Sequence, residues 1–172
     1  NNHLSFRAGL FETMFGGYGF EYLHLNEFSN IAYGFEIFDV KKRDYDQKFN
    51  FLEYETVTGH LNFYHYFDPL NMTTHFSWGQ YLAGDEGFTL DFSKRFKNGF
   101  KLGAYFSLTD VSFDEYGEGS FDKGIYVSLP INNLFNGENA MSHFKWSPLT
   151  KDPAQKLGLR YRIFGLMDRY IY

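Results

Sequence analysis

The chain has 172 residues, no cysteine and a formal net charge of -5, from 16 Lys plus Arg against 21 Asp plus Glu. Without cysteine it has no disulfide framework and no cysteine-ligated zinc site. The acidic balance and the lack of a clustered basic stripe argue against a nucleic-acid partner. Aromatic residues make up 22% of the chain, a content that excludes disorder, and the length predicts one domain over residues 1–172.

The beginning of the sequence carries no recognisable targeting segment. Asn1 to His3 show neither a basic n-region nor an apolar h-region, so we interpret the sequence as a mature chain or a fragment. No run approaches the roughly 18 apolar residues that a membrane-spanning helix needs. Membrane β-strands escape such a scan, because every second residue points away from lipid.

Alternation of apolar and polar residues with a period of two dominates almost every segment, and no amphipathic helix of useful length competes with it. In the clearest case, Phe88, Leu90 and Phe92 alternate with polar residues, and a second alternating run follows at 100–108. The two runs are separated by Asn98-Gly99, a dipeptide that favours a type I′ hairpin turn. In chain order the expected strands lie near residues 4–12, 18–25, 31–37, 56–64, 72–83, 88–93, 100–108, 125–131 and 157–163.

The connections differ in length in a way that favours an antiparallel meander. Tight turns are expected near Gly16-Gly17, Asp68–Asn71, Gly84–Gly87 and Lys97–Gly99, and longer loops at 41–50, 110–121 and 132–156. If the strands alternate in direction, the loops at 41–50 and 110–121 share one rim. Short turns on one rim and long loops on the other are typical of outer-membrane barrels.

The composition of the two strand faces favours a transmembrane barrel over a soluble one of lipocalin type. The polar face is mostly Gly, Ser, Thr, Asn and Tyr, with Lys101 the one lysine placed on it. The apolar face carries no charge, as lipid exposure requires when a midplane Lys or Arg costs roughly 2–4 kcal/mol. We therefore predict an all-β, antiparallel up-and-down transmembrane β-barrel of about 8–10 strands; a soluble barrel with its apolar face inward stays the alternative.

Closure of this barrel needs an even number of strands in a single bacterial chain. The nine expected strands therefore leave two interpretations open. Either one strand was missed, near Ser142–Ser147, or the chain is part of a larger barrel.

Six strings in register over most of the chain resemble the YjbH/GfcD family of outer-membrane exopolysaccharide and capsule biosynthesis proteins. They are LFETMFGGYGFEYLH (10–24), KRDYDQKF (42–49), VTGHLNFY (57–64), WGQYLAGDEGFTLDFSKRF (78–96), EGSFDKGIYVSLPI (118–131) and SPLTKDPAQKL (147–157). Family members are longer, lipoprotein-like chains, so the resemblance implies that this sequence is their C-terminal part. Pro153 and Ala154 depart from the Gly pair that the family tends to have in the last string.

The resemblance implies a role in the secretion or assembly of exopolysaccharide or capsule at the bacterial outer membrane. We expect the chain to be a non-catalytic component of that system and to need no cofactor. Its expected partners are outer-membrane lipid, polysaccharide and other secretion proteins of the same system. The alternative is a membrane-embedded barrel enzyme of esterase or acyl hydrolase type, in which His60 would serve as base for Ser77. The sequence shows no nucleophile, base and orienting group at recognisable spacing.

Candidate site residues lie on the polar face. The side chains that could contact sugar there are Tyr64, Tyr66, Tyr81, Asp91, Tyr105, Arg160 and Arg162. Tyrosine rings would stack on pyranose faces, and charged groups would bond hydroxyls; a small barrel filled by its own side chains is the competing interpretation. Two motifs are expected to be structural, namely Gly84-Asp85 and Asp122-Lys123-Gly124.

Metal binding has little support in the sequence. His24, His65 and His75 fall on separate strands, without the paired spacing of a zinc site. The acidic loop from Asp110 to Asp122 lacks the residue order of an EF-hand. We expect this loop to be a solvated rim loop.

Overall fold

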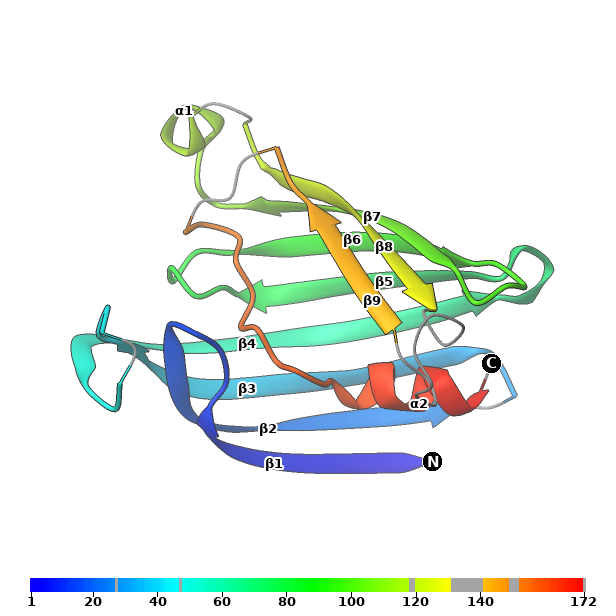
Figure 1. Ribbon diagram of the computed structural model, residues 1–172, viewed down its shortest axis with the longest axis horizontal. Helices are drawn as coiled ribbons and strands as arrows, with labels where there is room; N and C mark the ends of the chain where they lie inside the picture. Colours follow the sequence, from blue (N-terminus) through cyan, green and yellow to red (C-terminus); the bar gives the residue numbers. More distant parts are fainter. Residues whose placement is uncertain (27, 47, 118–119, 131–140, 149–151, 172) are drawn as a thin grey trace.

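The computed structural model describes residues 1–171 except 27, 47, 118–119, 131–140 and 149–151. Nine strands form one antiparallel sheet in which each strand pairs with the next along the chain (Figure 1). They are β1 (Asn2–Leu10), β2 (Phe15–Asn26), β3 (Ile31–Arg43), β4 (Phe51–Phe67), β5 (Met72–Gln80), β6 (Glu86–Arg95), β7 (Lys101–Thr109), β8 (Asp122–Pro130) and β9 (Met141–Trp146).

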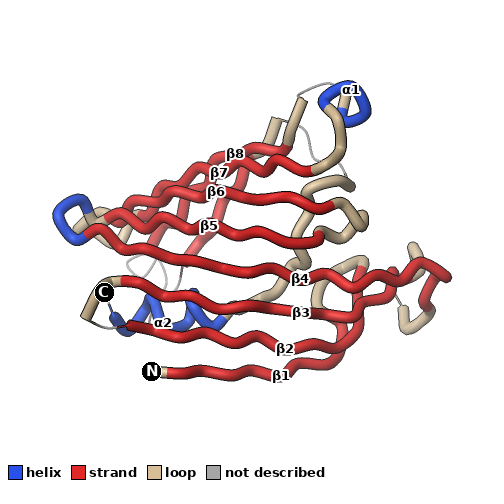
Figure 2. Tube along the Cα trace, turned by 180° about the vertical axis from the view of Figure 1, so that it is seen from behind, coloured by secondary structure: helices blue, strands red, loops and turns tan. Residues whose placement is uncertain are grey.

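The predicted antiparallel meander is thus confirmed, but the described residues form an open sheet and do not close the predicted barrel by themselves. Hydrogen bonding runs from β1 to β9 in sequence order, and no pairing joins β1 to β9 in the described part of the chain. The sheet is strongly curved, so that β8 and β9 turn over its concave side in both views (Figures 1 and 2). We call the two sides of the sheet the concave face and the convex face.

Eight of the nine expected strands are present, and β9 lies where the sequence suggests a missed strand. The expected strand at 157–163 is wrong. Residues 152–162, which we call the strap, form no strand but cross the concave face and lead into the helix α2 (Ile163–Ile171) (Figure 1). The expectation that no helix competes with the strands is therefore also wrong.

A local polar contact and an apolar contact explain why the chain becomes helical at Ile163. The Ile163 amide, one of those that a helix start leaves without an internal partner, donates to the Glu21 carboxylate at 2.9 Å. Ile163, Phe164 and Met167 follow helical spacing and pack against a buried cluster from β2, β3 and β4. The sheet thus supplies both the cap and the apolar surface that stabilise this short helix.

The hairpin between β6 and β7 is present, but its turn is not of type I′. Three residues, Lys97 to Gly99, separate Phe96 and Phe100, whose backbone groups are hydrogen bonded. Gly99 has a φ of 82°, whereas Asn98 does not have a positive φ. This geometry matches a three-residue hairpin loop that ends on a left-handed glycine.

The expected sharing of one rim by the loops at 41–50 and 110–121 is confirmed, whereas the tight turn expected near Gly16-Gly17 is wrong because both glycines lie in β2. The connections β1–β2, β3–β4, β5–β6 and β7–β8 share one rim, which we call the long-loop rim. One of these loops contains the short helix α1 (Phe113–Tyr116), capped by reciprocal bonds between Ser112 and Glu115. The opposite rim carries the tight turns after β4 and β6, the first of which includes η1 (Asp68–Leu70) and the left-handed Asn71.

The two faces of the sheet are inverted relative to a water-soluble protein. On β4 the apolar Leu61 is 57% exposed on the convex face, while its neighbours His60 and Asn62 are buried on the concave face. β3 repeats this order, with Phe35 and Ile37 exposed and Glu36 buried. Large apolar side chains therefore cover the convex face, and polar ones fill much of the concave face.

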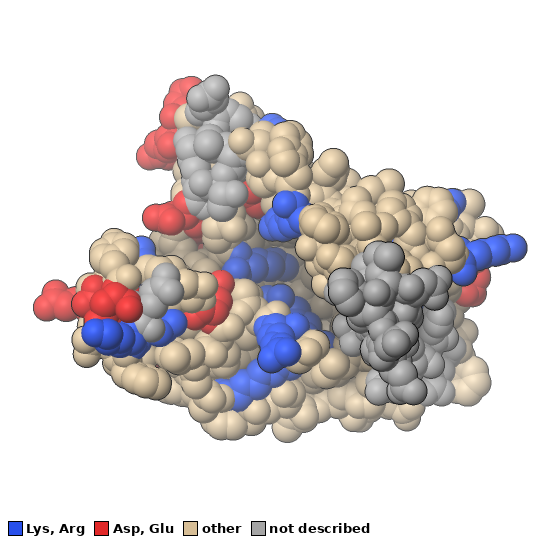
Figure 3. Space-filling view, in the orientation of Figure 1, with Lys and Arg blue, Asp and Glu red and all other residues tan. Residues whose placement is uncertain are grey.

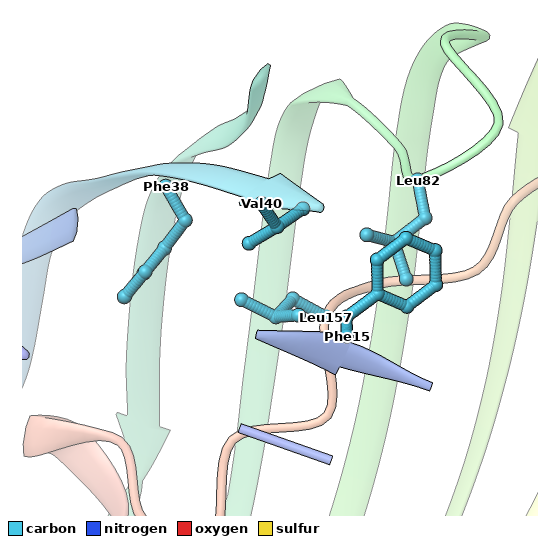
Figure 4. Close-up of a cluster of buried hydrophobic side chains, with 5 residues drawn as sticks. All are labelled: Phe15, Phe38, Val40, Leu82 and Leu157. Carbon is cyan, nitrogen blue, oxygen red and sulfur yellow. The ribbon is translucent and has the colours of Figure 1, made fainter. Parts of the chain in front are cut away.

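Two small apolar clusters interrupt the polar interior. The first joins Phe15, Phe38, Val40 and Leu82 to Leu157 of the strap, close to the long-loop rim (Figure 4). The second lies beneath α2. The strap contributes Leu157 to the first cluster, and α2 contributes Ile163 to the second. The C-terminal segment is therefore an integral part of the fold.

No helix among the described residues is long and apolar enough to cross a membrane.

Candidate functional site

The strap is fastened to the concave face by polar contacts along its whole length. Near its start the Ala154 amide donates to Asp85 at 2.8 Å, and the Leu82 amide donates to the Gln155 carbonyl at 3.0 Å. Further along, the Gly158 amide donates to Glu12 at 3.1 Å. These bonds bind the strap to the β1–β2 and β5–β6 connections, both on the long-loop rim.

A charged network holds the end of the strap above β2, β3 and β4. Arg162 donates to both carboxylate oxygens of Glu36, at 2.9 and 3.2 Å. His60 Nδ1 lies 3.6 Å from the same carboxylate. Arg7 of β1 donates to Glu21 at 2.8 Å and also bonds the Tyr161 carbonyl. Acidic groups of the sheet thus accept bonds from the strap and from β1.

Lys156 has an unusual environment in the middle of the strap. Its ammonium donates to the Ser77 hydroxyl of β5. Burial lowers the pKa of Lys156 to about 7, and the nearby Arg162 charge acts in the same direction. This side chain therefore loses its proton at a lower pH than an exposed lysine does.

The sugar-contacting residues predicted from the sequence all lie on the concave face, but they do not form one group. Tyr64 is sandwiched by the rings of His75 and Phe164, at centroid distances of 4.1 and 3.8 Å, and Tyr81 is fully buried against Thr89. Tyr66 bonds Asn71 at the tight-turn rim.

The remaining predicted residues keep some exposure. Asp91 accepts a bond from Tyr126 at 2.7 Å, and Lys145 lies over the ring of Tyr105 at 4.4 Å. Arg160 is exposed and stacks on Tyr161, whereas Arg162 pairs with Glu36.

The motif residues take part in local packing. Gly84 has a φ of 89° in the β5–β6 turn, and Asp85 accepts the strap amide described above. Asp122 is buried and accepts a bond from Tyr105, while the Lys123 carbonyl accepts from Ser147 at 2.8 Å. A side chain at Gly124 would meet the Trp146 carbonyl and the Tyr105 ring.

The arrangement of Ser77 and His60 does not suit the esterase alternative. Both side chains are buried, with relative exposures of 0% and 3%, so a substrate has no access to them. The Ser77 hydroxyl bonds Lys156, and the acidic neighbour of His60 is already engaged by Arg162. Among the described residues no group of three or more His, Asp or Glu side chains is placed to hold a metal ion.

A cavity of about 590 Å³ opens at the long-loop rim, beside the strap. Its walls come from the β1–β2 loop and the start of β2, from Lys42 of β3, from Leu52 and Tyr54 of β4, from the turn after β5, and from the strap. The sequence analysis missed its polar residues, because they come from segments far apart in the chain. One signal was present: except for Leu52 and Tyr54, every lining residue lies in four of the family-like strings.

Fold and site together define an all-β protein whose exposed apolar sheet face backs a polar, charged concave face crossed by a strap. A family model described as "Exopolysaccharide biosynthesis protein YbjH" matches residues 1–169. The chain belongs to this exopolysaccharide biosynthesis family.

One curated relative supports the same assignment. The chain is 41% identical over 166 residues to the "Uncharacterized lipoprotein YjbH" of Escherichia coli strain K12. The match covers 92% of this chain and 24% of the relative, so the chain spans about a quarter of that protein's length. No solved structure matches the chain.

Proposed function

We propose that this chain forms part of the wall of a β-barrel in the bacterial outer membrane, where it serves exopolysaccharide or capsule secretion without catalysing a reaction. The inverted sheet carries this proposal: large apolar side chains are exposed on the convex face while Glu, His, Ser and Thr are buried on the concave face. Only an apolar surrounding makes such an order favourable, because water would otherwise contact a continuous apolar surface.

The open edges are consistent with a larger barrel. In lipid each unpaired backbone group costs several kcal/mol, so β1 and β9 need partners if the convex face contacts lipid. We place these partners on further strands of a longer polypeptide, of which this chain is the C-terminal portion. The length of the E. coli relative provides room for such strands.

Polysaccharide and the other proteins of the secretion system are the proposed partners on the polar side. The family description supports an involvement with exopolysaccharide. The strap and α2 cross the concave face (Figure 1), so a sugar chain would contact residues that keep some exposure, such as the exposed Arg160 of the strap and the half-buried Tyr105 of β7. In this proposal the deeply buried Tyr64 and Tyr81 support the surface from below.

Arginine substitutions at two exposed apolar positions test the orientation of the sheet. Leu61→Arg places a charge in the middle of β4 on the convex face, and Phe28→Arg places the same charge in the fully exposed β2–β3 turn. In lipid the first change costs about 2–4 kcal/mol and the second almost nothing. In water both are surface substitutions that cost less than about 0.5 kcal/mol.

The readouts are membrane assembly, followed as heat-modifiable migration on gels, and the amount of secreted polymer. We expect Leu61→Arg to lose both and Phe28→Arg to keep both. Normal assembly of Leu61→Arg would place the convex face in water and overturn the proposed barrel.

A further inference from the structure

The cavity at the long-loop rim has the dimensions of a ligand site. Its volume of about 590 Å³ lies within the roughly 300–1,000 Å³ of small-molecule pockets. It lies on the rim opposite the tight turns, and its lining includes strap residues from the concave face. A sugar residue of a polymer on that face would therefore have an entrance to it.

Hydrogen bonds fix the walls of the cavity from several sides. Arg43 holds the β1–β2 loop through the Thr13 carbonyl at 2.9 Å, and its amide donates to the Met14 carbonyl at 2.7 Å. Tyr54 donates to the Leu82 carbonyl at 2.6 Å, which ties β4 to the β5–β6 turn. With the strap bonds to Leu82 and Glu12, these contacts join the segments that form the walls of the cavity.

The lining combines the aromatic ring of Tyr54 with the ammonium groups of Lys42 and Lys156. Tyr54 is partly exposed and packs edge-to-face against Phe15, at a centroid distance of 6.5 Å. Within the described ranges neither Lys42 nor Lys156 lies within salt-bridge distance of a carboxylate, and Lys156 instead donates to a hydroxyl. Glu12, Asp152 and Gln155 add hydrogen-bonding oxygens, so the lining carries two acidic and two basic side chains.

We propose that this cavity binds a carboxylate-bearing sugar residue of an acidic polysaccharide, with Tyr54 as the stacking surface and Lys42 and Lys156 as partners of the carboxylate. This inference rests on the proposed function and names the substrate class for it. A pyranose ring stacks on a tyrosine face, and a carboxylate forms charge-assisted bonds with ammonium groups. Glu12 and Gln155 accept bonds from the sugar hydroxyls.

The charge distribution of the concave face supports an anionic ligand. Figure 3 shows Lys and Arg side chains gathered around the hollow of this face, while most Asp and Glu side chains lie toward its edges. Burial and the nearby Arg162 charge lower the pKa of Lys156, while Glu36 and Asp91 act in the opposite direction, and a bound uronate would add to their effect. Four of the strings that resemble the family meet at this cavity.

Calorimetric titration of the purified protein in detergent micelles tests the proposal with two matched glycans. Hexagalacturonate carries the carboxylates, and maltohexaose is a neutral hexasaccharide of similar size. We expect measurable binding of hexagalacturonate and at least tenfold weaker binding of maltohexaose, about the difference that one charge-assisted bond provides.

Three variants assign the binding to the cavity. Lys42→Gln should weaken hexagalacturonate binding by about tenfold, and Tyr54→Leu should weaken it as well because the stacking surface is lost. Lys97→Gln makes the same chemical change in the exposed β6–β7 turn and should leave the affinity unchanged.

Three outcomes would each overturn the inference: no binding by the wild-type protein, equal affinity for the two glycans, or an equal loss in Lys97→Gln. Binding in micelles does not depend on assembly in the membrane. Absence of binding together with failed assembly of Leu61→Arg would therefore contradict this inference alone, whereas normal assembly of Leu61→Arg would contradict the proposed function.

Discussion

The pair of Arg162 and Glu36 is the contact whose removal should loosen the strap most. Glu36 is 4% exposed, accepts two bonds from Arg162 and has His60 Nδ1 at 3.6 Å. Arg162→Met removes the guanidinium and leaves the carboxylate buried without its main cation. Breaking a buried pair in this way costs roughly 3–5 kcal/mol. The Arg162 side chain is 26% exposed, so solvent offsets part of that cost and we expect about 2–4 kcal/mol.

A double-mutant cycle separates the pair from the shape of its side chains. Glu36→Gln combined with Arg162→Met leaves neither charge buried, so the double variant should recover at least half of the loss. Arg160→Met is the matched control, since Arg160 lies two residues away in the same strap, is exposed and contacts the Tyr161 ring. Its free energy of unfolding should change by less than about 0.5 kcal/mol.

Unfolding in detergent micelles gives the free energies, and hydrogen exchange locates the change. The amides of Gly158 and Ile163 donate to Glu12 and Glu21, so they should lose protection in Arg162→Met and keep it in Arg160→Met. A coupling energy below about 0.5 kcal/mol, or unchanged exchange at both amides, would refute the assignment of Arg162 as the main fastening of the strap.

Two further predictions concern other parts of the sheet. The free energy of unfolding should rise from about pH 7 toward pH 10 more steeply in the wild type than in Lys156→Met. The reason is that the fold lowers the pKa of Lys156 to about 7, so the unfolded chain binds more protons over this range. Equal slopes in urea titrations of the two proteins would contradict this. Gly79→Ala should block folding because its Cβ would lie 1.9 Å from the Gly59 carbonyl oxygen. In the control Gly165→Ala, the new Cβ in α2 meets nothing within 4 Å, so this change should be neutral or stabilising by up to about 1 kcal/mol. Thermal melts that show equal stability for the two variants would contradict the close packing of β4 and β5.

Period-two alternation predicted most of the strands because each alternating residue reports which side of the sheet it occupies. The same signal failed at 157–163 for a physical reason. Leu157 of the strap and Ile163 of α2 are buried in two separate apolar clusters. The apolar residues at 157–163 therefore reflect contacts with the concave face and not pairing with a neighbouring strand. The helix α2 has nine residues and includes Gly165, which left its periodicity too short to recognise.

The candidate site was less predictable than the fold. The sequence places strand residues such as Tyr64 of β4 and Asp91 of β6 on the polar face, because the alternation within each strand determines the side of the sheet. The cavity instead requires Glu12, Lys42 and Lys156 to converge, and this depends on the path of the strap. No local pattern specifies that path.

The sign of the charge on the concave face could not be predicted from the net charge either. The chain has a formal charge of -5, yet Lys and Arg surround the hollow of this face (Figure 3). The carboxylates of Glu21 and Glu36 are buried where they accept bonds from arginines and from the strap. Many of the other acidic residues lie in exposed loops at the rims. The cavity lining holds two lysines, Lys42 and Lys156, and two acids, Glu12 and Asp152. The charge that a ligand meets there therefore depends on how the strap and the β1–β2 loop converge, and not on the net charge of the chain.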